Sequence, residues 1–143
     1  MTINETQDEL ISDFSFMEEW MDKYEYIIQL GKDLPLIDPQ YKTDDNLIKG
    51  CQSKVWLHTE LVDSKLVFTA DSDAIITKGL VSLMVTVLSN HTPKEITDAD
   101  LYFIDKIGLS SHLSPTRSNG LLSMLKQMKI YALAYQAKAN SGS

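Results

Sequence analysis

The chain has 143 residues, a net charge of −7, 43% hydrophobic residues and one cysteine. This length and composition are typical of a single globular domain, which we expect to be residues 1–143 with a core over about 5–138. The single cysteine excludes an intrachain disulfide, a CxxC redox pair and a cysteine-rich metal or iron–sulfur site. The excess of acidic residues argues against binding to nucleic acid or an anionic membrane. No apolar run reaches the roughly 20 residues of a membrane span, and the N-terminus does not resemble a secretory leader, so we expect a cytoplasmic location.

The N-terminal third of the chain predicts two helices followed by a loop. Apolar residues recur at helical spacing, loosely over residues 3–14 and more regularly over 16–28. Gly31 would suit the left-handed residue that ends the second helix. Residues 34–45 contain two prolines and no periodicity, which is typical of a surface loop.

The middle of the chain predicts a β-hairpin and a buried helix. Apolar and polar residues alternate over about 54–70, interrupted by a turn sequence, as in two antiparallel strands. Two strands alone are marginally stable, so we expect a short third strand at about 46–49. Asp71 and Asp73 could cap the next helix, over about 74–89, which is apolar on nearly all sides and therefore predicted to be buried.

Two further helices are predicted towards the C-terminus. Pro93 is expected to interrupt the chain before a short helix over 98–107, and residues 109–119 look polar and irregular. The last helix is predicted over about 120–138, because apolar residues recur there at steps of three and four.

This order of helices, hairpin and helices predicts an α+β fold, in which helices cover one side of a small antiparallel sheet. The final residues, 139–143, are small and polar, and we expect them to form a disordered tail.

The acidic residues are unevenly distributed along the chain. Residues 1–50 contain 12 acidic residues and four lysines, a net charge of −8, and the remaining residues have a net charge of +1. The simpler interpretation is a set of solvated helical faces. The alternative is an acidic surface that steers a basic partner towards Cys51.

Cys51 follows Gly50, between a polar loop and the start of a predicted strand. Buried structural cysteines usually have apolar neighbours, whereas this one has polar neighbours and a glycine that gives the backbone freedom. Lys49 and Lys54 are close in sequence, and positive charge favours the reactive thiolate. The local sequence fits an inert loop thiol and a chemically active one equally well.

Three chemistries could use a single thiolate. A cysteine hydrolase needs a histidine base, but no local motif connects His58, His91 or His112 to Cys51. A peroxidase would form a sulfenic acid, and nothing in the sequence marks a peroxide pocket. Sulfur transfer needs only a mobile thiolate, a protected pocket and a docking surface.

Arg117 is the only arginine of the chain and lies in a polar segment before the last predicted helix. Its planar guanidinium suits the binding of oxyanions or backbone carbonyls in a fixed geometry. A solvated side chain is the simpler interpretation.

Four sequence blocks, together with residues 26–35, resemble the SufE family of sulfur acceptors, which includes the paralogue CsdE. They occur in the family's order between about residues 20 and 130, and they are Gly50-Cys51-Gln52-Ser53-Lys54-Val55-Trp56, Asp71-Ser72-Asp73-Ala74, Lys78-Gly79-Leu80 and His112-Leu113-Ser114-Pro115-Thr116-Arg117-Ser118-Asn119-Gly120-Leu121. These blocks do not separate SufE from CsdE.

The resemblance implies a SufE/IscU-like fold and a role in sulfur transfer. Cys51 would accept persulfide sulfur from a SufS-type or CsdA-like cysteine desulfurase, stimulate that enzyme, and pass the sulfur to a SufB-containing scaffold complex for iron–sulfur cluster assembly. The pyridoxal phosphate would belong to the desulfurase, so we expect no cofactor and no metal on this chain. Homodimerisation is left open.

The resemblance also assigns roles to individual residues. Cys51 would be the persulfide site, and Asp73 and Arg117 would lie near its loop and the desulfurase interface. Gln52, Lys78 and His112 match the motif as partner-binding or loop-supporting residues, whereas packing is the favoured role of Trp56 and Gly79. At rest, the sulfur is expected in an apolar pocket. A non-catalytic allosteric adaptor and a stand-alone cysteine hydrolase are the alternatives.

Overall fold

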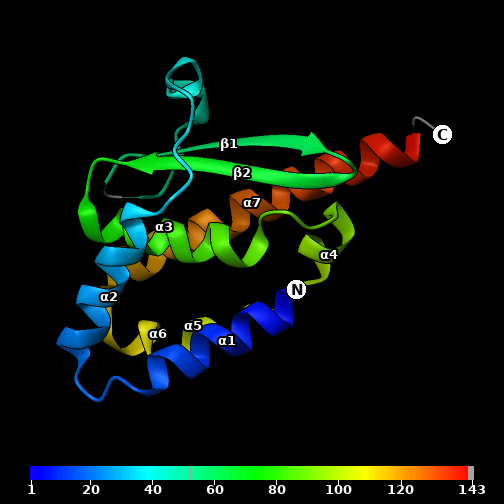
Figure 1. Cartoon of the computed structure of the whole chain (residues 1–143). Coiled ribbons are helices and arrows are strands. Elements are labelled where there is room, and N and C mark those ends of the chain that lie inside the picture. The colour runs from blue at the N-terminus through cyan, green and yellow to red at the C-terminus, as the bar shows by residue number, and fades with distance from the viewer. Residues whose placement is uncertain (52, 142–143) are drawn as a thin grey trace.

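The computed structural model describes residues 1–51 and 53–141 (Figure 1). Helices precede and follow a hairpin, which confirms the predicted α+β fold. The elements are α1 (Ile3–Ser15), α2 (Trp20–Lys32), the short 3-10 helices η1 (Pro39–Tyr41) and η2 (Asp44–Asn46), β1 (Val55–Val62), β2 (Lys65–Ser72), α3 (Ile75–Leu88), α4 (Pro93–Asp98), α5 (Phe103–Lys106), α6 (Leu109–His112) and α7 (Pro115–Ser141).

The hairpin forms where the alternation predicts it. Strands β1 and β2 pair antiparallel from Val55 opposite Ser72 to Val62 opposite Lys65. Asp63 and Ser64 form the two-residue turn, and both have positive φ angles, as the tight turns that suit twisted strands require.

The prediction of a short third strand at about 46–49 is wrong. Within the described residues, the sheet has two strands. Leu47 makes one isolated antiparallel bridge to Trp56, and the Ile48 N–H donates to the Val55 carbonyl at 2.9 Å. At Gly50 the chain takes a positive φ of 91°. We infer that this turn leads the chain away from the edge of β1 before a second bridge can form.

One side of the sheet carries the core. Helices α3 and α7 lie along this side, and residues 38–46 extend away on the other side (Figure 1). Eleven of the 14 residues of α3 are buried, as its apolar sequence predicts. Leu57 of β1 and Phe68 of β2 face this helix layer and are almost fully buried. The hydrophobic effect of this burial holds the hairpin against the helices.

Gly31 does not end a helix, and that prediction is wrong. Helix α2 starts four residues later than predicted and continues to Lys32. Gly31 instead packs against the backbone of α3, where a Cβ atom would lie 2.9 Å from the Gly79 nitrogen. At Gly79 a Cβ would collide with the Ile27 carbonyl. Two glycines therefore let α2 and α3 approach each other closely.

The region after α3 differs from the prediction. Pro93 does not interrupt the chain but occupies the first turn of α4, where its missing N–H costs nothing. Thr92 and Glu95 form a reciprocal capping box at the start of this helix. The single helix predicted over 98–107 is wrong: α4 ends at Asp98, and α5 contains only Phe103–Lys106.

Helix α7 begins earlier than predicted, so the irregular segment predicted over 109–119 is also wrong. Pro115 occupies its first turn, and the Ser114 hydroxyl accepts a hydrogen bond from the Arg117 N–H at 3.3 Å, as an N-cap does. The helix continues three residues beyond its predicted end, to Ser141. Residues 142–143 of the predicted tail lie outside the described residues.

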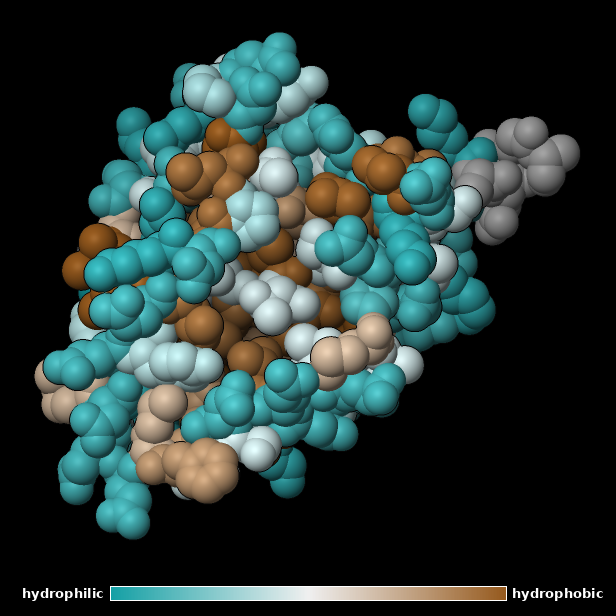
Figure 2. Space-filling model, in the orientation of Figure 1, coloured by the Kyte–Doolittle hydropathy of each residue, from teal (hydrophilic) through white to brown (hydrophobic). Residues whose placement is uncertain are grey.

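The exposed surface of α1 is hydrophilic. Figure 2 shows hydrophilic side chains over α1 and apolar side chains in the middle of this face, between α1 and the hairpin. All four acidic residues of α1 are exposed: Glu5, Asp8, Glu9 and Asp13. Within the described ranges, no helix is both long and apolar enough to span a bilayer.

We predict that Gly79→Ala destabilises the fold by roughly 1–3 kcal/mol, because the new methyl group would push α2 away from α3. The free energy of unfolding from urea titrations measures this loss. Thr86→Ala, at an exposed position of the same helix, is the matched control and should change it by less than about 0.5 kcal/mol. Equal stability of the two variants would contradict the close helix contact.

Candidate functional site

The Cys51 thiol lies against the N-terminal part of α7. Its Sγ donates a weak hydrogen bond to the Gly120 carbonyl at 3.6 Å, and the residue is half-buried. A Cβ added at Gly120 would lie 3.6 Å from Sγ, at van der Waals distance. A side chain larger than alanine would enter the space that the sulfur occupies.

The N-terminal side of the Cys51 loop requires glycine. Gly50 has a φ of 91°, a region that L-residues rarely adopt. A Cβ there would also lie 2.6 Å from the Ser123 Oγ of α7. The turn that delivers Cys51 therefore rests directly on the surface of α7.

The C-terminal side of the loop is held by Asp73. The Lys54 N–H donates to the Asp73 carboxylate at 3.0 Å, and the Asp73 N–H donates to the Lys54 carbonyl at 3.2 Å. The predicted helix-capping role of Asp73 is wrong, because Ala74 is the N-cap of α3 and makes no side-chain cap bond. Asp73 therefore fixes the residue at which the loop joins β1.

A small cavity of about 50 Å³ lies beside the thiol. A cavity holds a water molecule once about 10–15 Å³ is open to a water-sized probe, so there is room for at least one additional atom the size of sulfur. The expected apolar pocket is wrong in its chemistry, because the lining mixes polar and apolar residues: Cys51, Ser53, Thr77, Leu80, Thr116, Arg117, Gly120 and Met124.

Burial raises the pKa of the Cys51 thiol, because the partly dry surroundings disfavour the thiolate. The expectation that Lys49 and Lys54 would favour the thiolate is therefore wrong for this conformation. Both lysines are exposed, and water screens their charge. In this conformation the sulfur is protected and weakly nucleophilic.

Of the other predicted site residues that the structure describes, Arg117 lines the cavity, whereas Lys78 and His112 contact other side chains. Arg117 is exposed on the first turn of α7 and lines the cavity. The Lys78 Nζ lies 3.6 Å from the Asp71 carboxylate. His112 is exposed, and its ring lies 4.5 Å from that of Trp20, centroid to centroid. Gln52 lies outside the described residues.

The two residues with a predicted packing role contact other parts of the structure. Gly79 is buried against α2. Trp56 is half-buried on β1, and the Lys42 Nζ lies 4.6 Å from the centroid of its ring, within the range of a cation–π contact.

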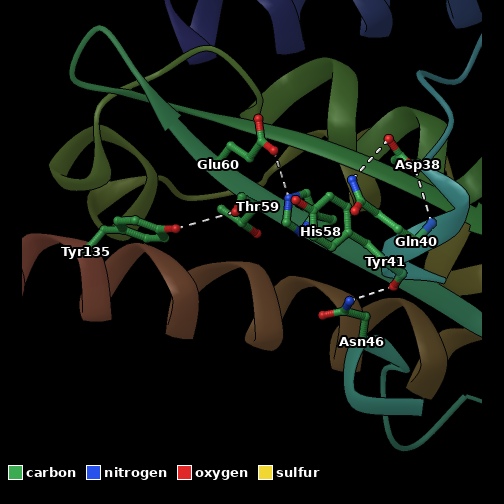
Figure 3. A network of polar contacts seen from close by, with 8 residues as sticks. All are labelled: Asp38, Gln40, Tyr41, Asn46, His58, Thr59, Glu60 and Tyr135. Atoms are coloured by element: carbon green, nitrogen blue, oxygen red, sulfur yellow. Dashed lines mark hydrogen bonds and ion pairs between the residues drawn. The ribbon is translucent and has the colours of Figure 1, made fainter. Parts of the chain in front are cut away.

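Each of the three histidines has a partner other than Cys51. The His58 ring stacks on that of Tyr41 with 3.7 Å between the ring centroids, and the His58 Nε2 lies 3.0 Å from the Glu60 Oε1, in the network of Figure 3. The His91 Nδ1 lies 3.5 Å from the Glu95 carboxylate, and the His112 ring packs against that of Trp20 at an interplanar angle of 36°. This arrangement argues against a hydrolase dyad. In the described part of the chain, no group of three or more His, Cys, Asp or Glu side chains is placed to hold a metal.

Sequence reasoning missed several residues that line the cavity. Ser53 and Thr77 meet at an Oγ–Oγ distance of 3.5 Å, and Met124 lies one helical turn after Gly120. The four-residue step from Gly120 to Met124 was a usable signal, because it places both residues on one face of a helix. Thr77 could be found only from the tertiary contact between α3 and the Cys51 loop.

Comparisons with known proteins agree on one family. The family model described as "SufE: Fe-S metabolism associated domain" matches residues 8–132. An uncharacterized SufE-like protein of Rhizobium meliloti (strain 1021) is 43% identical over 127 residues, which cover 85% of this chain and 91% of that protein. A second one, from Rhizobium etli, is 41% identical over 127 residues, covering 85% and 86%.

A solved structure has the same fold. The solution structure of a hypothetical protein from Thermus thermophilus matches with a TM-score of 0.77, covering 92% of this chain and 96% of that chain. The two sequences are 15% identical, so this likeness concerns the fold alone.

We predict that alkylation of Cys51 by iodoacetamide is slow at pH 7 and rises with an apparent pKa above that of the unfolded chain, about 8.5. The reason is that burial disfavours the thiolate relative to the neutral thiol. The contribution of this group to the free energy of unfolding is therefore lost as pH rises through the folded-state pKa. Rates measured from pH 6 to 10, in buffer and in guanidinium, compare the two states, and the single cysteine makes the signal unique. A folded-state pKa at or below the unfolded one would contradict the assignment.

We also predict that Asp73→Ala increases the alkylation rate at pH 7 several-fold while circular dichroism stays unchanged. The substitution removes the carboxylate that holds the Lys54 N–H, so the Cys51 loop opens more often. Asp98→Ala, which removes only a surface ion pair with Lys94, is the control. Equal rates for both variants would show that Asp73 does not hold the loop.

Proposed function

The chain belongs to the SufE family, and on that basis we propose that Cys51 accepts sulfane sulfur from the persulfide of a cysteine desulfurase. Family membership supports a sulfur-transfer role in iron–sulfur metabolism. The observation that carries the proposal at the level of residues is a lone, half-buried thiol beside a cavity with room for one more sulfur atom.

The transfer is a thiol–persulfide exchange. The Cys51 thiolate attacks the outer sulfur of the donor persulfide, forming one S–S bond as the S–S bond of the donor breaks. The donor cysteine leaves as a thiolate, and Cys51 becomes the persulfide. The number of S–S bonds is conserved, so the step needs no external oxidant or reductant.

The resting site favours storage over attack. The raised pKa keeps the thiol protonated near neutral pH, and its contact with Gly120 shelters the sulfur. That contact is one weak hydrogen bond plus van der Waals contacts, so moving Cys51 outward costs little compared with docking a partner. We infer that the docked donor draws Cys51 out of the cavity and exposes it as a thiolate.

The proposed donor is a SufS-type or CsdA-like desulfurase, which would contribute the pyridoxal phosphate, and the proposed acceptor is a SufB-containing scaffold complex. Arg117 and His112 are exposed near the start of α7 and are available to a partner. Asp73 and Lys78 serve instead to support the loop and the end of the hairpin.

The test is mass spectrometry of the protein after incubation with the desulfurase and cysteine. We predict that wild-type protein gains one or more sulfur atoms at Cys51, and that Cys51→Ser gains none and no longer stimulates the desulfurase. Thiol reduction should remove the added mass, because persulfides are reducible.

Circular dichroism of Cys51→Ser is the control for folding, since a hydroxyl fits where the half-buried thiol lies. Full stimulation by Cys51→Ser, with no sulfur found on the wild type, would favour the allosteric adaptor and overturn the proposal.

A further inference from the structure

Helix α7 has an unusual charge composition for this acidic chain. Its 27 residues contain Arg117, Lys126, Lys129 and Lys138 but no aspartate or glutamate. The chain as a whole has 20 acidic and 13 basic residues. Helix α7 is therefore a basic element on an acidic protein.

The same helix exposes an apolar stripe. Leu122, Ile130 and Leu133 have exposed fractions of 58%, 44% and 56%. At 3.6 residues per turn, these three residues and Lys126 fall within about 80° of the helix circumference. The opposite face of α7 packs in the core through Leu121, Met124, Met128 and Ala132. The stripe is therefore a second apolar face, and it points to solvent.

A groove of about 430 Å³ lies beside the stripe, between α7 and the segment that leads to Cys51. We call it the α7 groove. Its lining contains the bases Lys49 and Lys126 and one acid, Asp45. The full lining is Asp45, Asn46, Leu47, Ile48, Lys49, Ser123, Lys126, Gln127, Ile130 and Tyr131.

The α7 groove adjoins the Cys51 loop. Ser123 lines the groove and also contacts Gly50, the residue before Cys51. From Ser123 to Tyr131 the groove follows α7 for about 12 Å, the length of two helical turns. A partner segment seated there would lie next to the thiol.

We propose that the α7 groove docks an acidic, amphipathic helix of a partner protein. Apolar residues of that helix would pack on Ile130, which lines the groove, and on Leu122 and Leu133, which belong to the exposed stripe beside it. The three residues are eight and three positions apart and extend for about 16 Å along α7. Its carboxylates would face Lys126 and Lys49. The charge complementarity speeds encounter and rejects basic segments.

A second copy of this chain fits the groove less well. Its acidic helices α1 and α2 already bury apolar residues in the core, among them Phe14 and Ile27. Among the described residues, α1 exposes no large apolar side chain and α2 exposes only Met21, so neither presents an apolar stripe of its own. The docking helix therefore belongs to a different protein, and its recognition needs no sulfur on Cys51.

The test uses a synthetic, fluorescein-labelled 16-residue helical peptide with leucines on one face and glutamates on the other. The comparison peptide has lysine in place of each glutamate. We expect anisotropy titrations at low salt to show binding of the glutamate peptide at least about tenfold tighter than the lysine peptide, weakening as salt rises.

Leu122→Ser and Lys126→Glu should each weaken binding of the glutamate peptide about fivefold or more. The matched controls Met21→Ser and Lys32→Glu, at exposed positions of α2, should leave binding unchanged. Equal binding of both peptides, or equal effects of the α7 variants and the α2 control variants, would overturn the proposal. So would sedimentation data showing a dimer that Lys126→Glu dissociates, because the occupant would then be a second copy.

Cys51→Ser should bind the glutamate peptide as the wild type does. This result keeps the two proposals separate, since sulfur acceptance depends on Cys51 and docking depends on the α7 groove. Loss of peptide binding in Cys51→Ser, with the fold intact, would contradict a groove that works independently of the thiol.

Discussion

The position of Cys51 depends on the contact between its loop and α7. Gly50 lies against Ser123, and the sulfur lies against the carbonyl of Gly120. Helix α7 is itself fixed because its inner face packs in the core with α3. Burial of apolar side chains far from the thiol therefore determines where a single polar loop can rest.

This arrangement separates storage from reaction. A thiol that is half-buried and protonated is a poor nucleophile, but a persulfide in the same place would be sheltered from small thiols and oxidants. Asp73 holds one end of the loop through the backbone, and the glycine turn holds the other. Within the described part of the chain, Cys51 is held by one weak hydrogen bond and van der Waals contacts with Gly120, so a partner can move it without unfolding either end.

Sequence periodicity predicted the elements whose buried side chains follow a regular pattern along the chain. The hairpin and α3 follow directly from alternation and from a continuous apolar run. The short helix α4 and the start of the long helix α7 were misplaced because Pro93 and Pro115 were interpreted as breaks or loops, although proline fits the first turn of a helix.

The candidate site was predictable only in part. Motif resemblance identified Cys51, Asp73 and Arg117, and the structure places them around one loop. The raised pKa of Cys51 could not be derived from sequence, because the neighbouring lysines suggested the opposite and only tertiary burial reverses it. Gly31 was misassigned for a similar reason, since its role is the close approach of α3.

The charge distribution shows how a small acidic protein can present two kinds of surface. The excess of negative charge comes from residues before the cysteine, and the acidic residues of α1 are exposed, as for a solvated face. Helix α7 has no acidic residue, and its exposed leucines would cost solubility if they served no contact. Because α7 also carries the carbonyl that holds Cys51, a protein bound along this helix would act on the element that positions the thiol. Docking of a partner and outward movement of the Cys51 loop would then be coupled through α7.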